Sequence, residues 1–233
     1  MPVFNEASYI TRSLENVVQA KIPGWKKEII VVNDGSTDDT PVLLEKYQRQ
    51  NREIKIISNP KNLGKGGALK KGIRAATGEI TIIQDGDLEY DPGDYTTILK
   101  EFEKRDVNVV YGSRILGAKI YHNYNASLIF YLGGITLTKI INQAFGVNLT
   151  DQATCYKSWR SSLSEDLIKN CKRNGFEFEV ELTAFFARTG KIVEVPIHYY
   201  PRTINHGKKI NFWDFIKSIL VVFSYKLRQS QAG

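Results

Sequence analysis

The segment Glu28-Ile-Ile-Val-Val-Asn33 decides the fold, because this β-branched run ends in the turn Asp34-Gly35-Ser36. Thr40 and Pro41 then supply a helix N-cap and a proline at the first helical position, which predicts a helix over Val42–Gln50. A strand, a tight turn and a helix in this order are typical of a parallel sheet with crossover helices.

The same alternation continues through the first half of the chain. The predicted elements are, in order, strand Ile54–Ser58, helix Gly67–Ala76, strand Glu79–Gln84, helix Pro92–Lys104 and strand Val107–Tyr111. This order predicts an α/β fold with a Rossmann-like, mostly parallel sheet and flanking helices. Ligands of such sheets bind beyond the carboxyl ends of the strands, so site residues are expected in the turns that follow them.

The second half is richer in long apolar segments. Its predicted elements are helix Tyr124–Phe145, helix Phe176–Thr189, strand Lys191–Val195, the polar loop Tyr199–Ile210 and helix Asn211–Leu227. The final helix is expected to carry one apolar face, formed by Phe212, Phe215, Ile216, Ile219, Phe223 and Leu227. No run approaches eighteen uninterrupted apolar residues, and Leu128–Leu137 and Ile219–Phe223 are too short, so we expect no bilayer-spanning segment.

The composition is that of a globular protein with a basic end. Hydrophobic residues make up 42% and charged residues 24% of the 233 residues, which predicts a packed core. The segment from Pro201 to Gly233 holds six basic residues against one acid and supplies most of the net charge of +7. Such an end suits an anionic membrane surface, a phosphorylated substrate or nucleic acid. Two cysteines are too few for a disulfide scaffold or a zinc site, and no signal peptide opens the chain, so we expect a reducing, cytosolic environment.

The strongest candidate site is the acidic run Gln84-Asp-Gly-Asp-Leu-Glu-Tyr-Asp-Pro92. Asp85, Asp87 and Glu89 alternate, so in an extended segment their carboxylates would face one side. A hard divalent cation, Mg²⁺ or Mn²⁺, would neutralise these carboxylates and could also hold a pyrophosphate. The alternative is an acidic strand-to-helix loop without a ligand. An EF-hand is excluded because the twelfth position from Asp85 is Thr96 rather than glutamate.

Two further turns carry candidate binding residues. The carboxylate of Asp34, at a strand end, could accept hydrogen bonds from a base or a ribose, or it could serve only its own turn. The turn Asn62-Leu-Gly-Lys-Gly-Gly-Ala68 opens a helix, where glycines allow close approach of a phosphate and the helix N-terminus favours anions. This turn is neither a P-loop nor a dinucleotide fingerprint.

Taken in order, these motifs resemble the family 2 glycosyltransferases. Pro2-Val-Phe-Asn-Glu6 matches the family's opening signature, and the three motifs above follow at familiar separations. A narrower resemblance to the dolichyl-phosphate and undecaprenyl-phosphate sugar (mannose or glucose) synthases is carried by Gly112-Ser-Arg114, Asp151-Gln-Ala-Thr-Cys-Tyr-Lys157, and the loop from Tyr200-Pro-Arg202 to Gly207-Lys-Lys209. The resemblance covers nearly the whole chain. It implies a GT-A catalytic domain over residues 1–200, then at 201–233 a basic acceptor loop and an amphipathic, membrane-interfacial helix.

The resemblance also implies roles for single residues. The residues expected to bind the nucleotide-sugar are Pro2, Asn5, Glu6, Asp34, Gly64, Lys65, Asp85, Gly86 and Asp87. The metal ligands for Mg²⁺ or Mn²⁺ would be Asp85, Asp87 and Glu89, and the acceptor phosphate would meet Arg114, Arg202, Lys208 and Lys209. The catalytic set would be Asp87, Arg114, Asp151, Arg202 and Lys209, with Lys157 beside Asp151 on the sugar side. For each basic residue the alternative is a solvated charge or a surface ion pair.

Two departures from the family pattern qualify these roles. Relatives have an apolar strand before the Pro2–Glu6 signature, whereas this sequence begins at Met1, which puts the nucleotide site in question. Many relatives carry membrane-spanning helices after the catalytic domain, and this sequence stops at Gly233 without one.

The implied function is transfer of a sugar from a UDP- or GDP-linked donor to a polyisoprenyl phosphate, with inversion. A lipid phosphate is largely ionised near neutral pH, its second pKa being about 6, and can attack the anomeric carbon without a strong general base. The protein would then be peripheral on the cytoplasmic face of a membrane, where a membrane protein could be its partner.

Three alternatives stay open. The first is a family 2 transferase acting on a sugar hydroxyl, with Asp151 as the base. The second is a nucleotidyltransferase, whose glycine-rich signature would stand where this chain has Asn5-Glu-Ala7. The third is a nucleic-acid-binding module. It is disfavoured because the basic residues lie beside an amphipathic helix rather than among exposed aromatics on a sheet, so no nucleic acid is expected.

Overall fold

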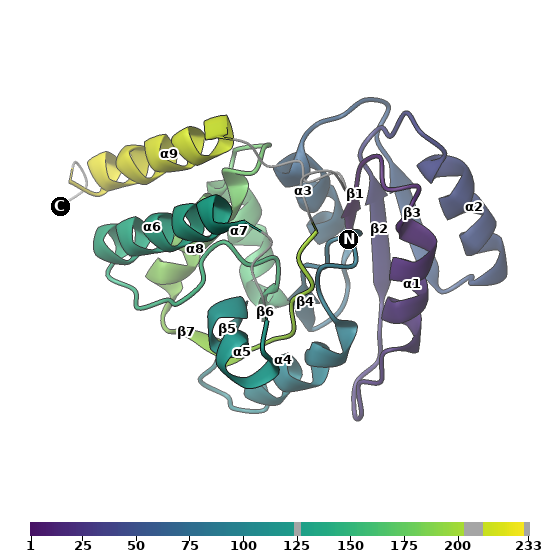
Figure 1. The fold of residues 1–233 in the computed structure, drawn as a ribbon, viewed down its shortest axis with the longest axis horizontal. Helices are drawn as coiled ribbons and strands as arrows, with labels where there is room; N and C mark the ends of the chain where they lie inside the picture. Colours follow the sequence, from purple (N-terminus) through teal and green to yellow (C-terminus); the bar gives the residue numbers. More distant parts are fainter. Residues whose placement is uncertain (124–126, 203–211, 231–233) are drawn as a thin grey trace.

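The computed structural model describes residues 1–123, 127–202 and 212–230. Two sheets form its centre (Figure 1). In the first, β1 (Pro2–Val3), β2 (Ile29–Asn33) and β3 (Ile54–Ser58) are all parallel and lie in that order. The second has the order β4-β6-β5-β7. Its strands are β4 (Ile80–Ile82), β5 (Val109–Ser113), β6 (Lys157–Arg160) and β7 (Ile192–Pro196).

The predicted α/β class with a mostly parallel sheet is confirmed, with one exception. Strand β6, which the sequence pattern did not reveal, is antiparallel to both β4 and β5, whereas β5 and β7 are parallel. The signature residues Pro2 and Val3 form β1 and pair with Val32 and Asn33 of β2. The opening motif therefore occupies a strand position beside the carboxyl end of β2.

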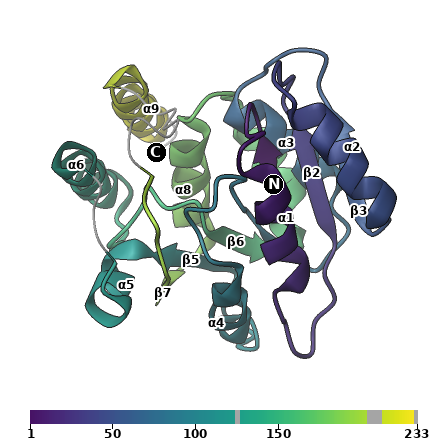
Figure 2. The same ribbon diagram turned by 45° about the vertical axis from the view of Figure 1, so that its right-hand side comes forward.

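Helices cover the sheets on both sides (Figures 1 and 2). In chain order they are α1 (Ile10–Gln19), α2 (Thr40–Gln50), α3 (Lys65–Ala75), α4 (Tyr95–Glu101), α5 (Arg114–Tyr121), α6 (Leu128–Phe145), α7 (Ser164–Asn170), α8 (Phe178–Thr189) and α9 (Phe212–Ser230). Short 3-10 turns, Pro92–Asp94 and Ser161–Leu163, precede α4 and α7. Helices α1 and α2 lie beside the first sheet, whereas α6, α8 and α9 lie together at the opposite end of the molecule.

The core is built mainly from aromatic residues of the second sheet and α8. The side chains of Tyr111, Tyr156, Trp159, Phe178 and Phe186 are fully buried in one cluster. Burial of each such side chain contributes about 1.5–3 kcal/mol, which fixes the second sheet against α8. A separate cluster, formed by Leu137, Ile141, Val180, Val221 and Val222, joins α6, α8 and α9.

Helix α9 differs from its prediction because it has two apolar faces. Phe215 and Ile219 pack against the cluster that joins α6, α8 and α9. Trp213, Leu220 and Phe223 are 68%, 61% and 59% exposed. The single apolar face expected from the sequence is therefore wrong, because one side of the helix packs on the protein and another faces outward.

One further expectation is corrected, and one finding bears on the expected absence of a bilayer-spanning segment. Thr40 is not the N-cap of α2 but its first residue, and its hydroxyl accepts a hydrogen bond of 2.9 Å from the backbone N–H of Glu6. In the described part of the chain one helix, α6, is long and apolar enough by length and composition to cross a membrane, with 17% of it buried. Thr136, Thr138 and Lys139 interrupt its apolar run, and the expectation of no bilayer-spanning segment stays a prediction.

Candidate active site

A cavity of about 850 Å³ opens at the carboxyl ends of the strands, where the sequence placed the site. Asp34 follows β2, Asp85 lies after β4, and Arg114 follows β5. The described candidates that line it are Pro2, Glu6, Asp34, Gly64, Lys65, Asp85, Gly86, Asp87, Glu89, Arg114, Asp151 and Arg202. Asn5 is not among the lining residues, and Lys208 and Lys209 lie outside the described residues.

Asp34 organises the glycine-rich turn within the protein. Its Oδ1 accepts hydrogen bonds from Asn59 Nδ2 at 2.6 Å and the backbone N–H of Leu63 at 3.0 Å, and its Oδ2 accepts one from the N–H of Gly64 at 2.8 Å. The side chain is buried. Three internal donors therefore occupy the carboxylate that was expected to meet the nucleotide, so Asp34 shapes the turn that opens α3.

Asn5 has a comparable local role. Its backbone has a positive φ of 51°, and its Oδ1 accepts a hydrogen bond of 2.8 Å from the N–H of Thr37. Its backbone N–H donates to Ser36 Oγ at 3.0 Å. These contacts join the turn after β1 to the turn after β2, so the first two motifs are held against each other.

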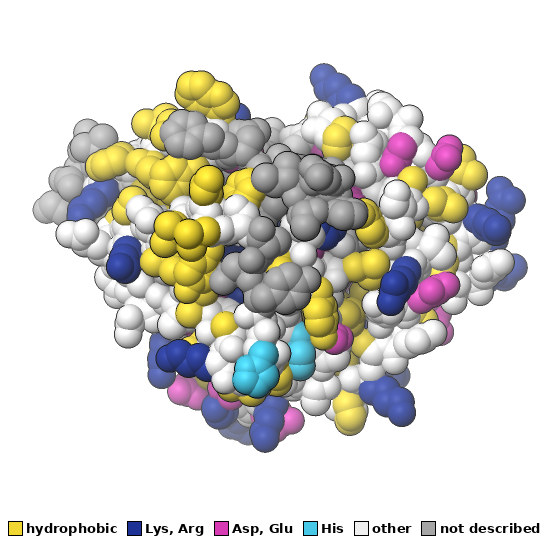
Figure 3. All heavy atoms as spheres, in the orientation of Figure 1, with side chains coloured by type: hydrophobic (Ala, Val, Ile, Leu, Met, Phe, Trp, Pro, Cys, Tyr) yellow, Lys and Arg dark blue, Asp and Glu magenta, His cyan; other side chains and the backbone are white. Residues whose placement is uncertain are grey.

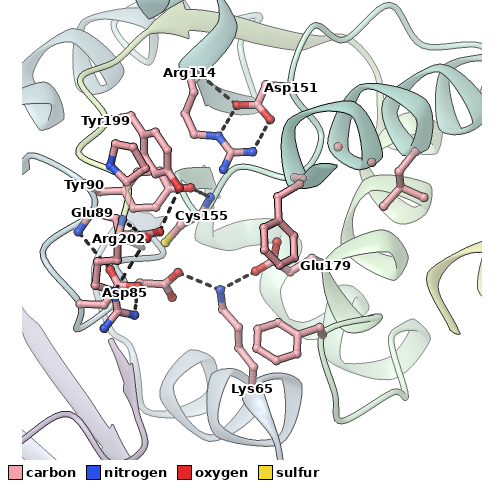
Figure 4. A pocket seen from close by; sticks show the side chains of 18 of the residues that line it. Lys65, Asp85, Glu89, Tyr90, Arg114, Asp151, Cys155, Glu179, Tyr199 and Arg202 are labelled. Carbon is pink, nitrogen blue, oxygen red and sulfur yellow. Dashed lines mark hydrogen bonds and ion pairs between the residues drawn. The ribbon is translucent and has the colours of Figure 1, made fainter. Parts of the chain in front are cut away.

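Lys65 is held between two carboxylates (Figure 4). Its Nζ lies 2.9 Å from Asp85 Oδ2 and 2.6 Å from Glu179 Oε1. Glu179 also contacts the buried Lys157 Nζ through Oε2 at 3.0 Å. Burial alone would raise the pKa of Glu179, but Lys157 and Lys65 outweigh that effect and lower its pKa to about 2. Lys157 does not line the cavity and acts on it through Glu179.

The acidic run is not extended, although Asp85, Asp87 and Glu89 all line the same cavity. Leu88 has a positive φ of 65°, which turns the chain between Asp87 and Glu89. Asp85 pairs with Lys65, whereas Asp87 Oδ2 lies 2.8 Å from Arg202 Nη2. Glu89 accepts hydrogen bonds from Tyr199 Oη at 3.1 Å and from the backbone N–H of Arg202 at 2.8 Å. The extended backbone expected for this run is therefore wrong, whereas the role of the three carboxylates as metal ligands stays a prediction.

Arg202 is surrounded by acids. Its Nη1 lies 3.2 Å from Glu6 Oε2, and its Nε lies 3.8 Å from Glu89 Oε1. Its guanidinium carbon also lies over the ring of Tyr9, 5.1 Å from the ring centroid. The side chain is 12% exposed. The loop residue predicted to bind phosphate thus neutralises the acidic run in this structure.

The acidic run fits a divalent cation in chemistry but not as the predicted triad. Among the described residues no group of three His, Cys, Asp or Glu side chains is placed to hold a metal. Burial, followed by the charges of Asp85 and Glu89, raises the pKa of Asp87 to about 7. Hard oxygen donors with excess negative charge suit Mg²⁺ or Mn²⁺. Asp85 and Asp87 both line the cavity and would be its ligands.

Arg114 and Asp151, both expected near the sugar and the acceptor phosphate, bind each other. Arg114 Nε lies 2.7 Å from Asp151 Oδ2, and Nη2 lies 2.7 Å from Oδ1. The backbone N–H groups of Thr150 and Asp151 donate to Glu194 at 2.7 and 3.0 Å. Asp151 is therefore a buried, paired carboxylate rather than one poised as a general base.

Sequence reasoning missed several residues that line the cavity. Glu179 is one, and its signal was a charge between Phe178 and Val180 in an apolar helical segment. Tyr90 and Tyr199 are others, and burial raises the pKa of both phenols well above the usual value. Other lining residues come from α6 and α9, among them Ile129, Phe130, Leu137 and Phe215, and they give the cavity an apolar wall.

Comparison with known proteins identifies similar sequences. The model of the family described as glycosyl transferase family 2 matches residues 1–168. Dodecaprenyl-phosphate galacturonate synthase of Rhizobium johnstonii is 28% identical over 211 residues, which cover 89% of this chain and 59% of that protein. Dolichyl-phosphate beta-glucosyltransferase ALG5C of Trichomonas vaginalis is 28% identical over 218 residues, covering 85% and 62%. The chain thus spans about three fifths of the length of these two relatives.

Solved structures share the fold. Glucosyl-3-phosphoglycerate synthase from Mycobacterium tuberculosis in complex with UDP has a TM-score of 0.71 at 18% identity, covering 97% of this chain and 78% of that one. A mannosyltransferase from Pyrobaculum calidifontis in complex with GDP-Man and Mn²⁺ has a TM-score of 0.58 at 20% identity, covering 84% and 53%. The M. tuberculosis enzyme has also been solved with Mg²⁺ and UDP (TM-score 0.67, 18% identity, covering 96% and 76%).

Proposed function

Because the chain belongs to glycosyl transferase family 2, whose fold and use of a nucleotide-sugar it shares, we propose that it transfers the sugar to a polyisoprenyl phosphate. One observation carries the choice of acceptor: a single cavity joins the charged ends of the strands to an apolar wall on α6 and α9. A lipid phosphate needs both parts, because its head is anionic and its chain is apolar.

The charged end of the cavity suits the donor diphosphate and the acceptor phosphate. Lys65 is the first residue of α3, where the helix N-terminus favours anions. Arg114 and Arg202 line the same cavity and supply two further cations. Each of the three is paired with a carboxylate in this structure, so binding of phosphate would exchange one anionic partner for another.

The chemistry proposed for this end is a single displacement. The lipid phosphate oxygen attacks the anomeric carbon, and the bond from that carbon to the donor diphosphate breaks, which inverts the configuration. Lys65 and Arg202 would orient the two anions and stabilise the leaving diphosphate. A divalent cation held by Asp85 and Asp87 would supply further charge for the diphosphate. Because the acceptor is already ionised, no general base is required.

The pairing of Asp151 bears on the rival acceptor. A sugar hydroxyl must lose a proton on attack, and Asp151 was the candidate base. Its two oxygens are occupied by the guanidinium of Arg114 at 2.7 Å each. This arrangement favours an acceptor that needs no base over a hydroxyl acceptor.

The outer surface of α6 and α9 supports a membrane as the source of the acceptor. Leu128 and Leu132 of α6 are 68% and 51% exposed, and Leu220 and Phe223 of α9 are 61% and 59% exposed. Figure 3 shows hydrophobic side chains gathered on this face over both helices. Helices α6 and α9 pack on each other. We propose that this face, called here the α6–α9 surface, lies in the headgroup region of the cytoplasmic leaflet, where amphipathic helices bind.

The proposal is tested by supplying labelled UDP-glucose, UDP-N-acetylglucosamine, UDP-galacturonic acid and GDP-mannose with polyprenyl phosphate and a divalent cation. The expected product is a polyprenyl-phosphate sugar that is extracted into organic solvent and is absent in the Asp87→Asn variant. Product found only on free sugars would support the hydroxyl acceptor instead. Pyrophosphate released from nucleoside triphosphate and sugar 1-phosphate would support the nucleotidyltransferase.

A further inference from the structure

The guanidinium of Arg202 contacts acids of the run Gln84–Pro92, although Arg202 is remote from that run in the sequence. It contacts Asp87 at 2.8 Å and Glu6 at 3.2 Å, and 115 residues separate it from Asp87. Its Nε is buried and has no hydrogen-bond partner among the described residues. The charge of the guanidinium is therefore neutralised, but its hydrogen bonds are incomplete. Another anionic partner could replace the carboxylates it contacts here.

The backbone around Arg202 is anchored independently of its side chain. The N–H of Arg202 donates to Glu89 Oε1 at 2.8 Å, and the N–H of Tyr200 donates to the carbonyl of Glu89 at 2.9 Å. The ring of Tyr199 lies beside Tyr90 with its hydroxyl on Glu89. The guanidinium can therefore leave Asp87 by side-chain rotation while the chain stays attached at Glu89.

We infer that the Arg202 guanidinium and a divalent cation are alternative partners of Asp87, so that Arg202 holds the acidic run closed until a cation and a diphosphate arrive together. A cation at Asp85 and Asp87 would repel a guanidinium at Asp87, and a diphosphate in the cavity would give Arg202 a new anionic partner. This inference rests on the proposed function for the diphosphate. Beyond that function, it predicts that the binding of the cation and the binding of the nucleotide are coupled, so that each strengthens the other.

The coupling is tested by titrating Mn²⁺ into nucleotide-free protein and following free Mn²⁺ by electron paramagnetic resonance. Arg202→Ala should bind Mn²⁺ about tenfold tighter than wild type, within the usual range for coupled sites. Adding UDP or GDP should tighten Mn²⁺ binding strongly in wild type and much less in Arg202→Ala. Arg202→Lys keeps a charge without the two-point geometry and should lie between them.

Arg49→Ala is the matched control, because it removes the same charge from an 82% exposed side chain on α2 that does not line the cavity. It should bind Mn²⁺ as wild type does. Thermal unfolding in EDTA checks folding: Arg202→Ala should melt below wild type, and Mn²⁺ should raise its melting temperature more than that of wild type.

Equal or weaker Mn²⁺ binding by Arg202→Ala would overturn the inference, as would a nucleotide effect of the same size in both proteins. Mn²⁺ binding to none of the variants would overturn it too. These measurements do not require sugar transfer. A failure of the proposed acceptor in the transfer assay is therefore distinguishable from a failure of the exchange at Asp87.

Discussion

Arg114 and Asp151 form a two-point ion pair, with Nε–Oδ2 and Nη2–Oδ1 distances of 2.7 Å each, in the wall of the cavity. The backbone N–H of Arg114 also donates to Asp151 Oδ2 at 3.0 Å, so the carboxylate caps the first turn of α5. Asp151 is buried, whereas the Arg114 side chain is 22% exposed. The pair therefore ties the loop before β6 to the helix after β5.

Arg114→Ala should lower the free energy of unfolding by about 3 kcal/mol, because it leaves a buried carboxylate without its cation. Arg114→Lys should recover only part of the loss, since an ammonium cannot make the parallel two-point contact. Urea unfolding of Arg114→Ala, Asp151→Ala and the double variant would measure the coupling. The exposed pair Lys169–Glu165 is the control, and its removal should cost much less. Additive losses at Arg114 and Asp151 would contradict the pairing.

Glu179 should make stability depend on pH. Its folded pKa of about 2 lies below the unfolded value of 4.5, so its stabilisation is present above pH 4.5 and is lost as the pH falls from 4.5 to 2. Glu179→Gln should therefore cost most near pH 7, on the order of 2–3 kcal/mol, and progressively less below pH 4.5. Urea unfolding at several pH values measures this difference.

Glu181 is the matched control for Glu179, two residues further along α8. Burial raises the pKa of Glu181, so its contribution should be largest below pH 4.5 and should fall as the pH rises through its folded pKa. Glu181→Gln should accordingly change stability with the opposite pH dependence. A constant difference between Glu179→Gln and wild type across the pH range would argue against the Lys65–Glu179–Lys157 network.

Gly64→Ala should destabilise the protein and weaken nucleotide binding. Gly64 has a φ of +87°, and a Cβ there would lie 2.5 Å from the carbonyl oxygen of Asn174. Gly146→Ala is the control, because φ is +69° and a Cβ would meet nothing within 4 Å among the described residues. Backbone strain costs roughly 1–2 kcal/mol at either site, and the clash should add about 1–3 kcal/mol at Gly64. An equal fall in melting temperature for Gly64→Ala and Gly146→Ala would contradict the predicted clash, because it would show that the backbone at Asn174 moves away from the new Cβ without a loss of stability.

Phe223→Glu should weaken binding to anionic liposomes without unfolding the protein, since Phe223 is exposed on the α6–α9 surface. Val42→Glu is the control, because Val42 is 66% exposed on α2 and lies away from that surface. Phe215→Glu should instead lower the melting temperature, because Phe215 packs among α6, α8 and α9. Wild-type protein that does not float with liposomes of any lipid charge would remove the membrane from the proposal.

The order of apolar runs and turns was enough to predict the α/β class and the end of the sheet that carries the site. A residue that directly follows a parallel strand must lie at the carboxyl edge of the sheet, so Asp34, Asp85 and Arg114 could be placed from the sequence. The glycine-rich turn was also expected to open a helix, predicted from Gly67, and α3 begins two residues earlier, at Lys65. These inferences need only the chain connectivity and the period of the side-chain pattern.

The partners of the charged groups could not be found in that way. The turn at Leu88 depends on a positive φ that leucine rarely adopts, so no local propensity signals that the acidic run is not extended. Nor does it signal that Asp87 and Glu89 both meet Arg202. Strand β6 is antiparallel to β4 and β5, and the path of the chain between the strands sets this direction. The residues of β6 do not themselves indicate whether the strand is parallel or antiparallel. The two apolar faces of α9 look alike in the sequence, and only packing against α6 and α8 separates Phe215 from Phe223.

Sequence alone therefore determined the α/β class, many of the strands and helices, the edge of the sheet where the candidate site was expected, and the family, because each of these is encoded in neighbouring residues. The tertiary structure decided which charged side chains form ion pairs with one another. Lys65 is set between Asp85 and Glu179, and Arg202 reaches back to Asp87 across 115 residues. The physical reason is that an ion pair in a cavity depends on the distance and burial of both groups, and for residues far apart in the chain only the packed fold fixes those quantities.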